Sequence, residues 1–284
     1  FALAESGRVV GSAASVLQGV HTSPGLGGVV LTHFDVSDTG TLAYVPGATT
    51  ERSDELLWVD HAGTESVITR GAGTWVHPRL SPDGQRISLD IHLPNGMRDV
   101  YIYEIPRGQI RQLTRTGFTW ESEWRPDGKR IATMSGAPAG QWSLFLVHTD
   151  FSGTPELLVR SSHAVPVSWF PDGRTLLFYD LVEGGIWKVS PASDEEPELV
   201  IRTEARERFP SLSPDGKWIA YVADESGRRE VFVQSFPALG PKHRISIDGG
   251  GEPLWSPDGR RLFFRERGQM LVVDVDTEPA FSAG

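Results

Sequence analysis

Short apolar runs recur along the chain, separated by clusters of turn-forming residues. Five of them are rich in β-branched and aromatic residues and lie at 86–91, 130–134, 175–179, 218–223 and 261–265. Runs of this length between turn signals predict β-strands. Further apolar runs follow each one, and the last run of a unit lies at 110–114, 156–159, 198–201 and 242–247. The pattern predicts an all-β chain without helices.

The same turn sequence stands shortly before each of the five runs. Pro-Asp-Gly occurs at 82–84, 126–128, 171–173, 214–216 and 257–259, with a Ser-Asp-Thr-Gly variant at 37–40. Proline presets φ for the second turn position, Asp bonds its own backbone, and Gly takes the positive φ that follows. The motif predicts a hairpin turn rather than a series of catalytic aspartates.

The six turn glycines are 43 to 45 residues apart, which indicates six structural repeats. Six units of four short strands predict a six-bladed β-propeller, with four antiparallel strands per blade. We expect one domain over residues 1–284, with blades that begin near 31, 75, 119, 163, 207 and 251. A large apolar residue stands four positions before each glycine and predicts a packing layer between blades: Val36, Leu80, Trp124, Trp169, Leu212 and Trp255.

The sixth unit ends after its third strand, whereas a spare strand-like segment lies at 14–20. We expect this N-terminal segment to supply the outer strand of blade 6. Such a closure would leave no free sheet edge at the junction of the two chain ends.

Composition narrows the classes of partner. The chain has no cysteine, which excludes disulfides and thiolate metal sites. Lys and Arg number 27 against 37 Asp and Glu, a net charge of −10, so we expect no nucleic-acid partner. No apolar run reaches the roughly 18 residues of a membrane helix, so we expect no membrane insertion of this segment. We also expect the protein to be a monomer. Phe1 in place of Met suggests a mature or excised piece.

The repeat resembles the blades of TolB-like propellers, most closely at 213–221, where it reads SPDGKWIAY. The stretches 36–47, 224–237 and 249–265 look like the C-terminal propellers of some bacterial Ser/Thr protein kinases. That resemblance implies a sensor or interaction module in an extracytoplasmic location, periplasmic or at the cell surface. The chain itself carries no kinase motif.

The first residues of each predicted inner strand carry the candidate chemistry. Seven positions before the glycines stand His33, His77, Glu121, Pro166, Phe209 and Glu252. The resemblance implies that this strand is innermost, so we expect these side chains to ring one mouth of the channel. His33, His77, Glu121 and Glu252 are of types that bind divalent metal ions, which makes a metal site one hypothesis. A solvated polar mouth and an acid–base site are the alternatives.

Two further sets of residues belong near this channel. Five positions before the glycines stand Asp35, Arg79, Glu123, Ser168, Ser211 and Leu254, which predict salt bridges that line the channel. Trp75, Trp120, His163 and Arg208 lie at or just before the inner strand starts. We predict that they anchor a ligand at the rim, with burial under neighbouring loops as the alternative.

No nucleophile elbow, His-Glu-x-x-His motif or phosphate-binding loop occurs in the chain. The sequence therefore favours a non-enzymatic module that binds a peptide, a protein or a small ligand at the channel mouth. A metal-assisted lyase or hydrolase with a His/Glu site is one alternative. The propeller half of a larger peptidase or kinase is another.

Overall fold

The computed structural model describes residues 53–59 and 64–283, apart from positions 94, 137–141, 161–162, 193–194, 226 and 279. Before residue 53 it describes short strands only. Four of these strands form two antiparallel pairs outside the blades. β1 (Ala2–Leu3) pairs with β2 (Val9–Val10), and β4 (Thr22–Pro24) pairs with β5 (Val30–Thr32). One 3₁₀ turn, η2 (Ile105–Arg107), is the single helical element of the described residues, and none of these residues forms a helix that could cross a membrane.

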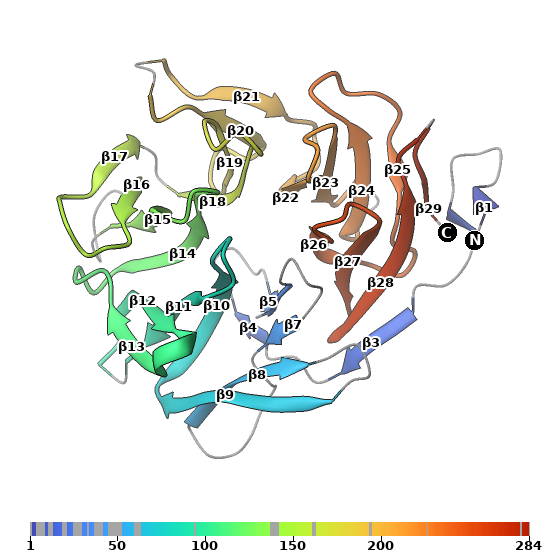
Figure 1. Ribbon diagram of the computed structural model, residues 1–284. Helices are drawn as coiled ribbons and strands as arrows, with labels where there is room; N and C mark the ends of the chain where they lie inside the picture. The colour runs from blue at the N-terminus through green and yellow to red at the C-terminus, as the bar shows by residue number, and fades with distance from the viewer. Residues whose placement is uncertain are drawn as a thin grey trace.

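Six antiparallel sheets stand around a common axis, which confirms the six-bladed β-propeller (Figure 1). Blades 1 to 5 each take their strands from one stretch of sequence, innermost strand first, whereas blade 6 also includes a strand from the N-terminal part of the chain. Blades 1 to 3 comprise β6 (Phe34–Val36), β7 (Leu42–Tyr44), β8 (Ser53–Val59) and β9 (Glu65–Ala72); β10 (Thr74–Leu80), β11 (Arg86–His92), β12 (Arg98–Glu104) and β13 (Gln109–Gln112); and β14 (Thr119–Trp124), β15 (Arg130–Ser135), β16 (Ser143–His148) and β17 (Glu156–Val159). Blades 4 to 6 comprise β18 (Ala164–Trp169), β19 (Leu176–Asp180), β20 (Ile186–Val189) and β21 (Glu198–Ile201); β22 (Arg208–Leu212), β23 (Trp218–Ala223), β24 (Glu230–Ser235) and β25 (His243–Arg244); and β26 (Gly251–Trp255), β27 (Arg261–Glu266), β28 (Gln269–Asp276) and β29 (Ser282–Ala283).

The Pro-Asp-Gly turns join the two innermost strands of blades 2 to 6. In blade 2 the Gly84 N–H donates to the Ser81 carbonyl at 2.8 Å, and Gly84 has φ 65°. Asp83 accepts hydrogen bonds from the Ser81 hydroxyl at 2.5 Å and from the Gln85 N–H at 3.0 Å. The aspartate is engaged in shaping the turn, as expected from the motif.

The N-terminal strand β3 (Ala14–Gln18) closes blade 6, as the sequence predicted. It pairs antiparallel with β28, with Met270 opposite Leu17 and Val272 opposite Ala14. The other end of β28 pairs with the C-terminal strand β29. Both ends of the chain therefore meet on one strand, and the ring closes through hydrogen bonds.

Blade 5 departs from the predicted strand pattern. The expected outer strand over 242–247 is only His243–Arg244. The Val231 N–H donates instead to the Ser246 hydroxyl oxygen at 2.8 Å, so a side chain takes the place of a backbone carbonyl. Serine can compete with the ladder in this way, which ends the strand early.

The packing layer four residues before the turn glycines lies between blades. Trp124, Trp169 and Trp255 are buried there. The Trp124 indole N–H donates to the carbonyl of Arg79 in the preceding blade at 3.0 Å, and that of Trp255 donates to the Ser211 carbonyl at 3.1 Å. These tryptophans both fill the interface and fix the position of the neighbouring inner strand.

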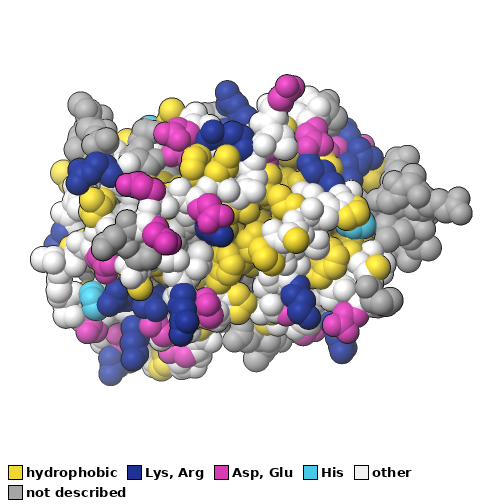
Figure 2. Space-filling view, turned by 90° about the horizontal axis from the view of Figure 1, so that it is seen from above, with side chains coloured by type: hydrophobic (Ala, Val, Ile, Leu, Met, Phe, Trp, Pro, Cys, Tyr) yellow, Lys and Arg dark blue, Asp and Glu magenta, His cyan; other side chains and the backbone are white. Residues whose placement is uncertain are grey.

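The outer side of the ring carries both charged and apolar side chains. Figure 2 shows one such side, where Lys and Arg are interspersed with Asp and Glu around a band of apolar side chains. Most outer strands expose one aliphatic residue, Val67, Ile110, Leu157 and Leu199. Single exposures of this kind are ordinary on a protein surface.

Candidate functional site

The innermost strands carry a bulge at the positions that the repeat singled out. The register against the next strand shifts there in blades 2 to 6. His77, Glu121, Phe209 and Glu252 adopt left-handed backbone conformations with φ between 51° and 59°. Non-glycine residues rarely do so, and a bulge redirects the side chain that it carries. We call these four the bulge residues.

A cavity of about 1000 Å³ runs along the propeller axis. Its lining begins at the Pro-Asp-Gly turns, for example at Pro82 and Pro214, and reaches the four bulge residues. The side chains of His77, Glu121 and Glu252 are only 5%, 13% and 12% exposed. They therefore lie deep in the cavity and not at an open mouth. We call the face with the Pro-Asp-Gly turns the turn face.

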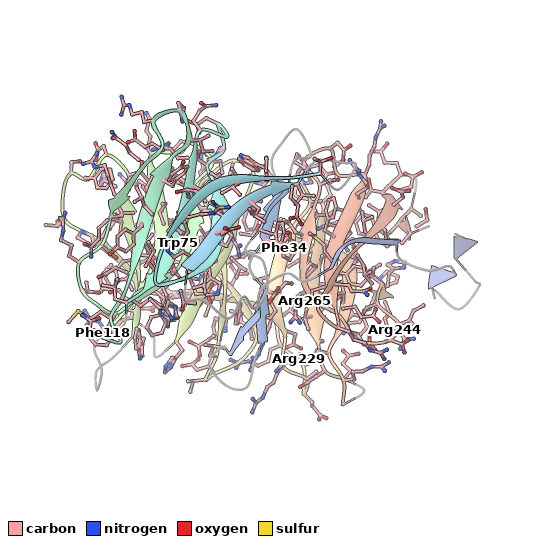
Figure 3. All side chains as sticks on the ribbon, turned by 90° about the horizontal axis from the view of Figure 1, so that it is seen from below. Phe34, Trp75, Phe118, Arg229, Arg244 and Arg265 are labelled. Atoms are coloured by element: carbon pink, nitrogen blue, oxygen red, sulfur yellow. The ribbon has the colours of Figure 1, made fainter. Side chains whose placement is uncertain are left out.

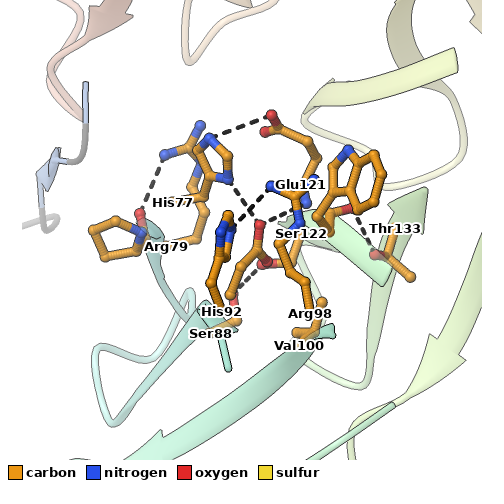
Figure 4. A network of polar contacts seen from close by, with 12 residues as sticks. His77, Arg79, Ser88, His92, Arg98, Val100, Glu121, Ser122 and Thr133 are labelled. Atoms are coloured by element: carbon orange, nitrogen blue, oxygen red, sulfur yellow. Dashed lines mark hydrogen bonds and ion pairs between the residues drawn. The ribbon is translucent and has the colours of Figure 1, made fainter. Parts of the chain in front are cut away.

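His77 lies between two carboxylates (Figure 4). Its Nδ1 is 2.7 Å from Asp90 Oδ2, and its Nε2 is 3.3 Å from Glu121 Oε1. Asp90 also accepts a hydrogen bond from the Glu121 N–H at 3.0 Å, which ties blade 2 to blade 3. Burial would lower the pKa of His77, but Glu121 and the hydrogen bond to Asp90 raise it overall. The arrangement favours the imidazolium form.

Arg79 is surrounded by carboxylates from three blades. Its Nε is 3.4 Å from Glu123 Oε2, a channel-lining ion pair of the predicted kind. Burial would lower the pKa of Arg79, but the surrounding carboxylates raise it; they are Asp35, Glu123, Glu121 and Glu252. Burial raises the pKa of Glu123 to about 8 although Arg79 opposes this. Acidic side chains outnumber basic ones in the described lining of the cavity, where Asp35, Asp83, Glu121, Glu123 and Glu252 stand against His77 and Arg79.

The predicted rim residues are more enclosed than expected. Trp75 is 3% exposed, and it packs so closely on Gly71 that a Cβ there would lie 2.2 Å from the ring. Trp120 is 9% exposed and lies under the Arg98 guanidinium, 3.6 Å from the ring centre. Both tryptophans are therefore buried, but by packing against neighbouring strands and side chains and not under loops, as Trp75 on Gly71 of β9 shows.

His163 and Arg208 complete this set. His163 is half-buried, with its ring centre 6.1 Å from that of Trp142. Arg208 is 4% exposed. Neither these two nor the two tryptophans are among the described residues that line the axial cavity. Their role as ligand anchors stays a prediction.

The proposed metal ligands are only partly described. His33 lies outside the described residues. His77 contacts Glu121, whereas Glu252 Oε2 is 3.6 Å from Arg265 Nε. Within the described part of the chain, no three His, Asp or Glu side chains are grouped so that they could hold one metal ion. A metal site at His33, His77, Glu121 and Glu252 stays a prediction.

The sequence reading missed one set of residues on the second strands of blades 2, 4 and 6. Asp90, Tyr179 and Arg265 all stand six positions after a turn glycine. Asp90 and Arg265 contact the bulge residue of their own blade, and Tyr179 lines the cavity. In the side view of Figure 3, Arg265 lies at mid-height of the propeller, whereas Arg229 reaches toward an end face. Alignment of the repeats on their glycines would have found this set.

The fold is that of TolB. The TolB structure from Acinetobacter baumannii superposes with a TM-score of 0.71 at 19% identity, over 86% of this chain and 63% of that one. No family model matches the chain. The likeness confirms the TolB-like six-bladed propeller, and at this identity it concerns the fold alone.

Two relatives add sequence similarity. An uncharacterized protein of Agrobacterium fabrum is 24% identical over 195 residues, which are 66% of this chain and 64% of that protein. The tricorn protease of Thermoplasma acidophilum is 21% identical over 238 residues, 76% of this chain but 22% of the protease. The chain therefore corresponds to only part of each of these proteins.

Proposed function

We propose that this TolB-like propeller is a non-enzymatic binding module that receives its ligand in the axial cavity, through the turn face. The observation that carries the proposal is the cavity itself, about 1000 Å³ in volume and lined at its deep end by side chains from several blades. A concave, mostly apolar site with a few convergent polar groups is the usual form of a ligand pocket. The ligand is a short peptide, a peptide segment of a protein or a small molecule.

The charges of the cavity select for a ligand with a positively charged end. Asp35, Glu121 and Glu252 act on Arg79 from their places around the axis, whereas Glu123, with a pKa of about 8, is largely protonated at neutral pH. His77 lies 3.3 Å from Glu121 and Arg265 lies 3.6 Å from Glu252, so these two carboxylates are partly offset. The net charge of −10 adds to the attraction of cations at longer range. Nucleic acid is correspondingly disfavoured.

The family resemblance supports the location that we propose, and the monomeric state is part of the same proposal. Propellers of this kind on bacterial kinases lie outside the cytoplasm, so we place this module in an extracytoplasmic compartment and treat it as a monomer. It would act there as the sensor or interaction part of a longer protein.

The test is a binding screen with short peptides and amines on the wild-type protein. Trp58, Trp124, Trp169 and Trp255 line the cavity, so a bound ligand should change tryptophan fluorescence. The double variant Glu121→Gln, Glu252→Gln should weaken binding of cationic hits by about tenfold or more, since a hydrogen bond to a charged group contributes about 1.5–3 kcal/mol. Exposed Glu156→Gln and Glu278→Gln form the matched control. A screen without hits, or hits that bind the double variant unchanged, would overturn the proposal.

A second function is favoured by the tricorn relative. The chain aligns with 22% of that protease, which fits a propeller that admits peptides to a catalytic domain elsewhere. Co-purification with a peptidase domain encoded in the same gene would support this function. A parent gene that encodes no hydrolase domain would exclude it.

A further inference from the structure

The wall of the axial cavity differs between two sectors of the ring. Blades 4 and 5 contribute Val165, Val167, Tyr179, Phe209 and Leu212, and no charged residue of these two blades is in the described lining. All charged residues in that lining come from blades 1, 2, 3 and 6. A ligand in the cavity therefore meets an apolar wall on one side and charged side chains on the others.

Tyr179 and Phe209 form the deep part of the apolar wall. Phe209 is the bulge residue of blade 5, and its ring packs edge-on against that of Tyr179, with centroids 5.3 Å apart. Both rings belong to one hydrophobic cluster with Val165. Phe209 is only partly buried, so part of its ring remains open to a ligand. An apolar side chain placed against this wall would be removed from water, which favours binding.

Two glutamates flank this apolar wall. Glu121 is the bulge residue of blade 3, which adjoins blade 4, and Glu252 is that of blade 6, which adjoins blade 5. The repeat places both at the same level along the axis as Phe209. Burial raises the pKa of Tyr179 well above its usual value; Glu121 and Glu252 raise it further, and two arginines oppose this. The apolar wall thus has a carboxylate at each side.

The deep end of the cavity suits the end of a molecule. The side chains of His77, Glu121 and Glu252 are only 5%, 13% and 12% exposed there. Such low exposure leaves little open space around them, so we expect a terminal group to reach them and not the middle of a chain. A peptide that enters through the turn face would bring one of its termini to this place.

We propose that the deep end binds the free amino terminus of a peptide whose first residue is aliphatic or aromatic. The ammonium group faces Glu121 and Glu252, and the first side chain lies against Tyr179 and Phe209. The proposal rests on the proposed function, since it concerns the same cavity. An amino-terminal residue carries both groups on one Cα, so it can meet the carboxylates and the apolar wall at once. A lysine side chain would instead have to immobilise a flexible four-carbon stem.

The first arm of the test varies the ligand. The tripeptide amides Leu-Ala-Ala and Gly-Ala-Ala, N-acetyl-Leu-Ala-Ala and N-acetyl-Ala-Lys-Ala are titrated into the wild-type protein, with calorimetry as the readout. The free leucine peptide should bind about tenfold or more tightly than its acetylated form, which lacks the charge-assisted contacts. It should also bind about tenfold or more tightly than the glycine peptide, which leaves the apolar wall uncovered.

The outcomes separate this inference from the proposed function. Equal affinity of the free and acetylated leucine peptides, or tighter binding of the acetylated lysine peptide, would overturn the inference and leave the proposed function standing. Equal affinity of the leucine and glycine peptides would do the same. Failure of all four to bind would also overturn the inference, and the broader screen of peptides and amines would then decide the proposed function.

The second arm varies the protein. Phe209→Ala should weaken the free leucine peptide by about tenfold and leave the glycine peptide unchanged, because only the former uses the apolar wall. Phe209→Leu keeps apolar bulk at the bulge and should give a smaller loss, which covers the case in which the alanine variant does not fold. Leu157→Ala, at an exposed aliphatic position on β17, is the matched control and should change neither peptide.

The two halves of the site should respond independently. The double variant Glu121→Gln, Glu252→Gln should remove the difference between the free and acetylated leucine peptides, whereas Phe209→Ala should preserve it. Melting curves of all variants confirm that they are folded. A folded Phe209→Ala variant that weakens the leucine and glycine peptides equally would show that Phe209 does not contact the first side chain, and would overturn the inference.

Discussion

The propeller uses the left-handed backbone conformation in two rings, and they differ in the residues that adopt it. At the turns it is adopted by glycines, with φ of 65° to 69° in blades 2 to 6. At the bulges it is adopted by His77, Glu121, Phe209 and Glu252, with φ of 51° to 59°. Glycine tolerates this conformation, whereas other residues are strained in it. The turn glycines therefore adopt this conformation at little energetic cost. The bulge residues are strained in it, and the strained backbone directs their side chains toward the axis.

The largest expected effect concerns the layer between the two rings. Trp124→Ala should lower the free energy of unfolding by about 3–5 kcal/mol, the usual range for truncation of a buried aromatic residue. It removes both the packing and the hydrogen bond to the Arg79 carbonyl. Trp124→Phe keeps most of the packing and should cost less. Chemical denaturation measures both, and a loss below about 1 kcal/mol for the alanine variant would show that this layer does not join the blades.

The turn ring can be tested at Gly84, where an added Cβ would meet no atom within 4 Å. Gly84→Ala should therefore lower the free energy of unfolding through backbone strain alone, by about 1–2 kcal/mol. Denaturant titration of this variant measures that cost directly. A neutral substitution would mean that the turn relaxes out of the left-handed conformation.

At the bulge ring a glycine should be favourable, whereas at the turn ring the loss of a glycine should be unfavourable. Both Glu252→Gly and Glu252→Ala remove the carboxylate, but only glycine relieves the strain at φ 52°. We expect the glycine variant to be more stable than the alanine variant by up to about 1 kcal/mol, although glycine is normally the worse strand residue. Greater stability of the alanine variant would show that the bulge is not strained.

The smallest effect contrasts His77 with His92 on the adjacent strand. Burial, together with the nearby Arg98, lowers the pKa of His92 to about 4, in contrast to the raised pKa of His77. The stability that depends on neutral His92 is present above the unfolded value of about 6.5 and is lost as the pH falls toward 4. His92→Gln should reduce the fall in melting temperature between pH 7 and 5.5, by about one or two degrees. An identical pH dependence in both proteins would contradict the lowered pKa.

The candidate site was accessible from the sequence only in part. The repeat identified the bulge positions, because blades 2, 3, 5 and 6 present the same position to the axis. Their depth was not predicted, since it depends on how far six sheets converge. Asp90 and Tyr179 were missed because nothing in a single strand indicates which of its faces meets a neighbouring blade.

The fold itself was set by the sequence, because turn chemistry and strand periodicity are local and recur six times at a constant spacing. Even the closure by β3 followed from counting strands, since an incomplete blade and a spare strand leave one pairing. Tertiary structure alone decided the electrostatics of the axis. The contact of His77 with Glu121, the carboxylates around Arg79 and the exposure of Tyr179 to the cavity join residues tens of positions apart. Coulomb and hydrogen-bond energies depend on distance and burial, and these quantities exist only once the ring has closed.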